Sequence, residues 1–260
     1  MTNDSNLVLV DVDDGIATVT LNRPEVRNAL NLGLRAAIHD TMGEVDGRDD
    51  VDVIVLTGAG PAFCAGLDLK ELSREDDGGR PTLRAGPNEW RFFAETATPV
   101  IAAVNGAAVT GGLELVLQCD LIVASEKATF GDTHARVGVL PGGGLTVRLP
   151  EAIGYRAALA MSLSGNFLTG QRAYELGLAY AVVAPDELLP AAHALARDIM
   201  GADRATMRQV LAVYREATLH AGGEALRHEA AAFSAWLPTV TPGAVGARKD
   251  GIISRGRAQQ

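Results

Sequence analysis

Three short runs of almost uninterrupted apolar residues place the strongest constraint on how this chain can fold. They are VDVIVLTG (51–58), PVIAAVNG (99–106) and DLIVAS (120–125), rich in β-branched side chains. A strand that is apolar on both faces must be covered on both faces, which is typical of a parallel sheet between layers of helices. Because segments with helical spacing flank these runs, the sequence predicts an α/β fold.

Other patterns divide the chain into a core and a C-terminal part. Residues 7–21 alternate in the manner of strands around the turn Asp13-Asp14-Gly15. We predict a core domain over 1–190 and a C-terminal helical region over 191–260, whose apolar faces would pack on another subunit or on the chain's own core. The helical stripes are Leu34, Ile38, Met42 and Val45; then Met207, Val210, Leu211 and Tyr214; then Leu226, Ala230, Phe233 and Leu237.

One polar segment interrupts the predicted core. Residues 73–89 are rich in Gly and Pro and predict a loop within the domain. The aromatic residues that follow, Trp90, Phe92 and Phe93, are interpreted as core side chains, with the lining of an acyl channel as the alternative.

Composition excludes several classes of function. Lys and Arg number 23 against 32 Asp and Glu, a net charge of −9 without any basic cluster, which argues against a nucleic-acid surface. Cys64 and Cys119 lie far apart in apolar runs and are expected to be reduced thiols, and the five histidines are scattered, so no metal site is expected. The polar N-terminus and the absence of an apolar run of roughly 18 residues predict no signal peptide and no membrane span, hence a cytoplasmic protein.

Three stretches bring backbone amides and polar side chains together. The first, PAFCAGLDLKEL (61–72), follows an apolar run and turns at Ala65-Gly66 into a predicted helix. The first N–H groups of a helix have no intrahelical partner and can bind an anion or a developing oxyanion. The alternative is an ordinary connection between a strand and a helix.

The second stretch, AAVNGAAVTGGLELVLQCD (102–120), opens a short helix with Gly111-Gly112. Glu114 follows among leucines and a valine, where a carboxylate is costly unless it is paired, protonated or used. The alternative is a glutamate that faces solvent from a partly buried helix.

The third stretch is FGDTHARVGVLPGGG (130–144). His134 titrates near neutral pH and could transfer a proton, and the N–H groups of the Pro141–Gly144 loop could hold a water or an anion. A lone histidine is more often structural, so both interpretations stay open at this point. Arg136 is interpreted as a surface or interface charge.

Together these stretches, with TLNRPEVRNAL (20–30) and LTGQRAYELGLAYAVV (168–183), resemble the enoyl-CoA hydratase/isomerase family, also called the crotonase superfamily. The resemblance implies a spiral of ββα turns and C-terminal helices used in a homotrimer or a dimer of trimers. It also implies an acyl-CoA thioester ligand, in which coenzyme A belongs to the substrate and no separate cofactor is needed.

The resemblance assigns roles to particular residues. It places oxyanion-hole amides at Leu67 and Gly111, whose N–H groups would bind a thioester oxygen and hold it more tightly as an enolate. Contacts to the CoA thioester substrate are implied at Ala29, Ala65, Asp68, Leu69, Lys70 and Gly142.

The catalytic positions contain one departure from the family pattern. Hydratases of the family use two glutamates around one water; Glu114 stands at the first position, but the second holds His134. We therefore expect an enoyl-CoA hydratase-like enzyme with Glu114 and His134 as acid/base groups. The alternatives are an acyl-CoA-binding homologue with little turnover, and another enolate chemistry such as thioester hydrolysis or decarboxylation. The 3,2-isomerases are disfavoured, since they depend on the second carboxylate.

Overall fold

The structure, a computed structural model, describes residues 7–73, 91–240, 243, 247–248, 251 and 253–254, and of residues 218–221 the backbone alone. The predicted loop at 73–89, apart from Ser73, and the residue Trp90 lie outside the described residues.

The described strands form two sheets. They are β1 (Val8–Asp13), β2 (Ile16–Leu21), β3 (Val53–Gly58), β4 (Ala62–Cys64), β5 (Val100–Val104), β6 (Ala107–Val109), β7 (Leu121–Ser125), β8 (Thr129–Gly131), β9 (Phe167–Thr169) and β10 (Ala181–Val183). The larger sheet has the order β1-β2-β3-β5-β7-β10 and is parallel except for the β1–β2 hairpin. The smaller has the order β4-β6-β8-β9, with β9 antiparallel to β8.

Helices cover these sheets. They are α1 (Leu32–Asp46), α2 (Leu69–Leu72), α3 (Gly111–Gln118), α4 (His134–Val137), α5 (Leu145–Ile153), α6 (Tyr155–Ser164), α7 (Gly170–Glu175), α8 (Leu188–Met200) and α9 (Arg204–Trp236), with short 3-10 helices at Pro24–Val26, Pro185–Glu187 and Leu237–Thr239. The α/β fold is therefore confirmed, as are the strands expected in the three apolar runs and the first helix.

The central strands are buried on both faces. Along β3, Ile54 and Leu56 face the main core, whereas Val53 and Val55 face a second core that α8 covers. Because side chains alternate between the faces of a strand, covering both faces requires the continuous apolar runs seen in the sequence. The β1–β2 turn has positive φ at Asp14 and Gly15, as a tight hairpin requires.

One structural unit recurs along the core. A strand of the larger sheet leads to a strand of the smaller sheet and then to a helix, in β3-β4-α2, in β5-β6-α3 and in β7-β8-α4. This is the expected spiral of ββα turns. Since parallel strands end at one edge, each turn brings the start of its helix to the same side of the smaller sheet, where the candidate residues gather.

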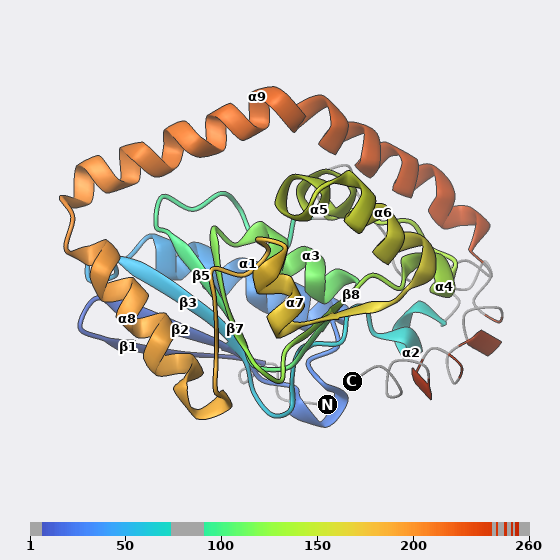
Figure 1. Cartoon of the computed structure of the whole chain (residues 1–260), viewed down its shortest axis with the longest axis horizontal. Coiled ribbons are helices and arrows are strands. Elements are labelled where there is room, and N and C mark those ends of the chain that lie inside the picture. Colours follow the sequence, from blue (N-terminus) through green and yellow to red (C-terminus); the bar gives the residue numbers. More distant parts are fainter. Residues whose placement is uncertain are drawn as a thin grey trace.

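The C-terminal part is dominated by α9, which runs along one side of the molecule over α5 (Figure 1). Of its two predicted apolar stripes, the second buries Phe233 and, just beyond the helix, Leu237. The first stripe lines a cavity of about 690 Å³, with Val210 and Tyr214 exposed. The boundary at residue 190 and the packing on other subunits stay predictions. Within the described residues, no helix is long and apolar enough to cross a membrane.

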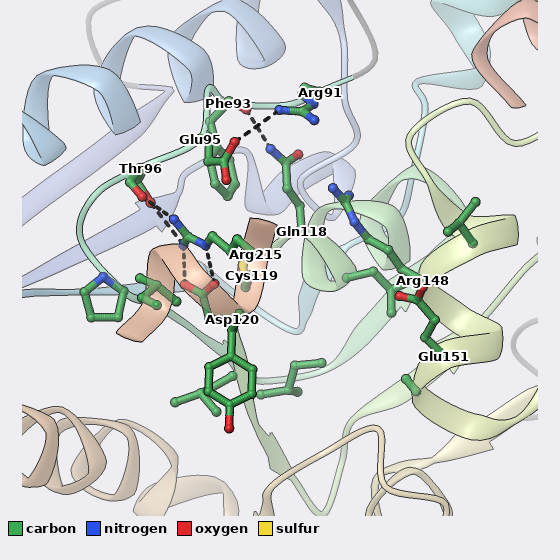
Figure 2. A pocket seen from close by; sticks show the side chains of 18 of the residues that line it. Arg91, Phe93, Glu95, Thr96, Gln118, Cys119, Asp120, Arg148, Glu151 and Arg215 are labelled. Atoms are coloured by element: carbon green, nitrogen blue, oxygen red, sulfur yellow. Dashed lines mark hydrogen bonds and ion pairs between the residues drawn. The ribbon is translucent and has the colours of Figure 1, made fainter. Parts of the chain in front are cut away.

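An ion pair fastens α9 to the core beside this cavity (Figure 2). The guanidinium of Arg215 forms two hydrogen bonds with Asp120, Nε to Oδ1 at 2.9 Å and Nη2 to Oδ2 at 2.6 Å, and Nη1 donates to the carbonyl of Thr96. Asp120 Oδ2 also accepts from the Val100 amide at 2.8 Å, at the start of β5. A planar guanidinium matches this set of acceptors, which an ammonium cannot.

The change Arg215→Lys keeps the charge but loses the paired geometry, so we expect the free energy of unfolding to fall by about 1–3 kcal/mol. Urea denaturation followed by circular dichroism measures it. Arg197→Lys, at an exposed arginine of α8, is the matched control and should change stability by less than about 0.5 kcal/mol. Equal losses in the two variants would contradict a special role of Arg215.

Candidate active site

Two backbone amides meet where α2 and α3 begin. Gly66 has φ +88°, and a side chain there would place a Cβ 2.6 Å from the carbonyl oxygen of Val109, so only glycine fits this turn. A Cβ built on Gly111 would lie 3.7 Å from the nitrogen of Leu67, which shows how close the two segments are. A parallel bridge between Leu30 and Leu67 holds the first segment in place.

Neither amide has an acceptor within the described parts of the chain. Among residues 7–73 and 91–240, no group takes a hydrogen bond from the N–H of Leu67 or of Gly111. Thr110, which precedes Gly111, has φ +55° and ψ −115°, an unfavourable conformation for a β-branched residue. Its amide donates to Gly131 O at 2.8 Å and its hydroxyl bonds that of Thr133 at 2.7 Å, which holds this conformation in place. The arrangement can therefore bind an oxyanion.

Glu114 lies in the first turn of α3 and is buried, with 3% of its surface exposed, which rules out the solvent-facing alternative. Its Oε1 accepts from the amides of Gly142 and Gly143 at 3.1 and 2.7 Å. Its Oε2 lies 3.7 Å from Nε2 of His134. That separation exceeds a normal hydrogen bond, so one water bonded to both groups is geometrically plausible.

His134 begins α4 and is also buried. Its Nδ1 is 2.6 Å from Oδ1 of Asp132, and the same oxygen accepts the backbone amide of His134 at 3.1 Å. Asp132 is 1% exposed and therefore points inward. A carboxylate on Nδ1 keeps a proton on that nitrogen and turns Nε2 toward Glu114. Nothing in the sequence around Asp132 shows whether its side chain faces inward; the fold brings all three side chains together.

Burial and charge shift the acidity of these groups. Burial raises the pKa of the Glu114 carboxyl to about 7, against the opposing effect of the imidazole of His134. Burial alone would lower the pKa of His134, but the carboxylates of Glu114 and Asp132 outweigh it and raise that pKa. Burial likewise works to raise the pKa of Asp132, but its hydrogen bond to His134 prevails and the pKa is lowered. Near neutral pH, Glu114 and His134 can therefore both exchange protons.

The amides of the glycine loop that follows α4 have acceptors within the protein. The sequence analysis left open whether these N–H groups hold a water or an anion, and in the structure protein carboxylates accept from three of them. Gly142 and Gly143 donate to Glu114, and Gly144 donates to Glu229 of α9. Sequence reasoning missed Glu229, although its place four residues before Phe233, on the predicted apolar stripe, was a signal.

Five of the six predicted substrate contacts line one cavity of about 340 Å³: Ala29, Ala65, Asp68, Leu69 and Lys70. Leu67, predicted as an oxyanion-hole residue, lines it too, as do Thr110 and Thr133, which directly precede Gly111 and His134. The sixth contact, Gly142, lies apart and lines a different cavity of about 570 Å³ on the side of α9.

Two residues that the sequence analysis missed shape this cavity. Arg23 donates from Nη1 to the carbonyl of Ala29 at 2.5 Å and lies 3.4 Å from the carboxylate of Asp68. Asp68 also caps α2 by accepting from the amide of Lys70 at 3.1 Å. The buried Asn28 donates from Nδ2 to the carbonyls of Ala62 and Phe63 in β4, at 2.9 and 3.1 Å. Of the polar side chains predicted to contact CoA, Lys70 remains exposed.

Arg136 was interpreted as a surface or interface charge. It is partly buried in the chain, and its Nε donates to the carbonyl of Ser164 at the end of α6 at 2.8 Å; a place at an interface stays a prediction. Phe92 and Phe93 are core side chains, as interpreted. Cys64 and Cys119 are buried and free. In the part of the chain that the structure describes, no group of three or more His, Cys, Asp or Glu could hold a metal ion.

Comparison with known proteins gives consistent matches. A sequence profile described as enoyl-CoA hydratase/isomerase matches residues 11–241. A probable enoyl-CoA hydratase of Mycobacterium leprae is 36% identical over 235 residues, 89% of this chain and 90% of that protein. A hydroxycinnamoyl-CoA hydratase-lyase of Pseudomonas fluorescens is 35% identical over 207 residues, 77% of this chain and 75% of that protein. An enoyl-CoA hydratase structure from Mycobacterium smegmatis superposes with a TM-score of 0.81 at 45% identity, covering 90% of this chain and 100% of that one.

The raised pKa of Glu114 predicts a pH-dependent loss of stability. The carboxyl of Glu114 has a pKa of about 7 in the folded protein, against an ordinary value of 4.5. Between these two pH values the folded protein binds more protons than the unfolded chain. The contribution of Glu114 to the free energy of unfolding is therefore full below about pH 4.5 and is lost as the pH rises through 7. In Glu114→Gln this loss disappears. We expect the unfolding free energy of the variant, relative to wild type, to rise by roughly 3 kcal/mol between pH 5 and pH 8. Denaturant unfolding at several pH values measures this free energy. Glu126→Gln, at an exposed glutamate, is the control. If the unfolding free energies of Glu114→Gln and Glu126→Gln depend on pH in the same way, the raised pKa of Glu114 is contradicted.

Proposed function

We propose that this chain, which belongs to the enoyl-CoA hydratase/isomerase family, adds water across the 2,3 double bond of an enoyl-CoA thioester. The names of its relatives support the hydratase assignment. The observation that carries it is the buried group of Glu114, His134 and Asp132 next to the amides of Leu67 and Gly111.

The proposed role of the Leu67 and Gly111 amides is to bind the thioester oxygen. When water adds to C3, the electrons of the double bond move to that oxygen and form an enolate. Preorganised N–H donors stabilise the developing negative charge more than the neutral carbonyl, and that difference lowers the barrier. The strained backbone of Thr110 supports this role because it fixes the direction of the second amide.

The acid and base steps are assigned to the two side chains that face each other. Glu114, ionised, takes a proton from water as the water oxygen bonds C3. His134, protonated, gives its Nε2 proton to C2 as the enolate returns to a thioester. The proton on Glu114 then passes to His134 across the 3.7 Å that separates Oε2 from Nε2. One water is consumed and both groups return to their starting states.

Asp132 supports the use of a histidine at the position where the family pattern has a second glutamate. By bonding Nδ1 of His134 it stabilises the imidazolium, so a cation that would otherwise be disfavoured by burial becomes a usable acid. This arrangement supports turnover rather than a binding protein that has lost a catalytic group, because two carboxylates and a proton donor are all retained.

The cavity of about 340 Å³ is the proposed site for the CoA part of the substrate. Five predicted substrate contacts line it together with Leu67, whose amide is one of the two oxyanion donors, and Lys70 is available to phosphates. Coenzyme A would enter as part of the substrate, without a separate cofactor. We further propose assembly as a homotrimer or dimer of trimers, which the exposed apolar side chains Tyr155, Leu163 and Tyr214 support.

Removing the base should abolish hydration without abolishing binding. For Glu114→Gln we expect kcat/KM for crotonyl-CoA to fall by about 10²–10⁴, measured by loss of the enoyl absorbance, with the Kd for the thioester little changed. Glu126→Gln is the control. Wild-type turnover in Glu114→Gln would remove Glu114 from the mechanism. Release of free CoA or of carbon dioxide by the wild type, or tight binding without product across a panel of enoyl-CoAs, would replace hydration by one of the alternatives.

The pH profile tests the role of Asp132. The reactive form needs Glu114 ionised and His134 protonated, so kcat/KM should fall on the acid side as Glu114 takes up a proton and on the alkaline side as His134 loses one. Asp132 raises the pKa of both groups. Asp132→Asn should therefore move both limbs to lower pH, whereas Asp186→Asn, at an exposed aspartate, should move neither. An unchanged alkaline limb in Asp132→Asn would exclude His134 as the acid.

A further inference from the structure

Glu229 is a buried carboxylate on α9 that the reaction itself does not use. It is 6% exposed. Its Oε1 accepts from the amide of Gly144, and its Oε2 accepts from both the amide of Thr146, at 2.6 Å, and the hydroxyl of Thr146. A carboxylate removed from water is costly unless donors satisfy it, and here three donors converge on one side chain.

All three donors belong to the end of the glycine loop and the first turn of α5. The first amides of a helix lack intrahelical partners, and the helix dipole favours a negative charge there. Such a position is usually capped by a neighbouring residue in the chain, but Gly144 has no side chain to do so. A glutamate more than eighty residues away supplies the acceptor instead. The start of α5 is thus attached to α9.

The same loop holds Glu114 at its other end. Gly142, Gly143 and Gly144 present three successive amides, of which two donate to Glu114 and the third to Glu229. The amides that bond Glu114 and Glu229 belong to successive peptide units that share the Cα of Gly143, so a displacement of Gly144 acts directly on the residue whose amide bonds Glu114. The two carboxylates are therefore coupled through the loop.

Tight packing leaves the loop little room to move. A Cβ built on Gly143 would lie 2.9 Å from Cδ of Glu114, and one on Gly142 would lie 2.9 Å from Cγ of Phe233. Phe233 is one turn beyond Glu229 on the same helix, so α9 contacts the loop by a hydrogen-bonding group and by an aromatic ring. Displacement of either contact would be transmitted to Glu114.

We propose that Glu229 is a positioning residue: by holding Gly144 and Thr146 it fixes the loop whose amides aim the Glu114 carboxylate at the reacting water. The inference rests on the proposed function in taking Glu114 as the base. The contact between Glu229 and the loop can be tested without any turnover.

The negative charge of Glu229 also affects the pKa of Glu114, and this pKa can be measured separately from the stability of the protein. The charged groups around Glu114 are His134, Asp132, Arg148 and Glu229. Of these, Glu229 raises the pKa of Glu114 by its negative charge. Replacing it by the neutral glutamine should lower the pKa of Glu114 while nearly preserving the shape of the side chain.

The experiment compares Glu229→Gln and Glu229→Ala with Glu224→Gln, at an exposed glutamate of the same helix, in the full-length chain. With crotonyl-CoA, we expect kcat to fall by about tenfold to a hundredfold in Glu229→Ala with little change in KM, less in Glu229→Gln, and not at all in Glu224→Gln. The acid limb of the pH profile should move to lower pH in Glu229→Gln and stay in place in Glu224→Gln.

Two measurements do not depend on turnover. Infrared titration follows the protonated carboxyl band that disappears in Glu114→Gln; its midpoint should fall in Glu229→Gln and stay in place in Glu224→Gln. Hydrogen exchange followed by mass spectrometry should show faster exchange of the amides of residues 142–146 in Glu229→Ala.

An unchanged infrared midpoint together with unchanged kcat in Glu229→Gln would overturn the proposal, and so would faster loop exchange without any change in kcat, because the contact would then be structural only. If Glu229→Ala fails to fold, kcat and the infrared midpoint of Glu229→Gln test the proposal. If the wild type hydrates no enoyl-CoA, but the infrared midpoint shifts in Glu229→Gln and the loop amides exchange faster in Glu229→Ala, the reaction assignment fails and the positioning of Glu114 by Glu229 stands.

Discussion

The site depends on a backbone constraint that each turn of the spiral must meet. The chain leaves a strand of the smaller sheet and begins a helix within a few residues, which forces unusual backbone angles at Gly66 and Thr110. The first amides of a helix have no partner within it, and the spiral stacks these helix starts beside one another. The amides of Leu67 and Gly111 and the side chains of the following turns are thereby brought to one place.

Burial of charge is the second constraint, and in this fold each buried carboxylate accepts several hydrogen bonds from the protein. Asp132, Glu114 and Glu229 are all nearly inaccessible, yet each accepts at least two hydrogen bonds from the protein. Backbone amides provide most of them. This arrangement keeps carboxylates in a low-dielectric site without forcing all of them to be protonated, and it leaves the pKa of Glu114 near neutrality.

The C-terminal helix takes part in the site as well as in the fold. In its first half, Arg215 bonds Asp120 between β5 and β7. Two turns before its end, Glu229 bonds the loop that holds Glu114. The helix therefore runs across the molecule (Figure 1) with one polar contact to the core in each half.

Local sequence indicated the buried strands, the first helix and the C-terminal helical region, because the apolar runs and stripes reflect burial along β3, β5, β7 and α1, and because glycines mark the turns. Glu114 was indicated by its apolar neighbours, whereas His134 received an acid/base role only through the resemblance to the family. Tertiary structure alone decided that Asp132 points inward, that the glycine amides bond carboxylates rather than solvent, and that Glu229 reaches the loop. Those contacts join residues from separate elements, and no periodicity along the chain records which side chains from distant segments will share a buried space.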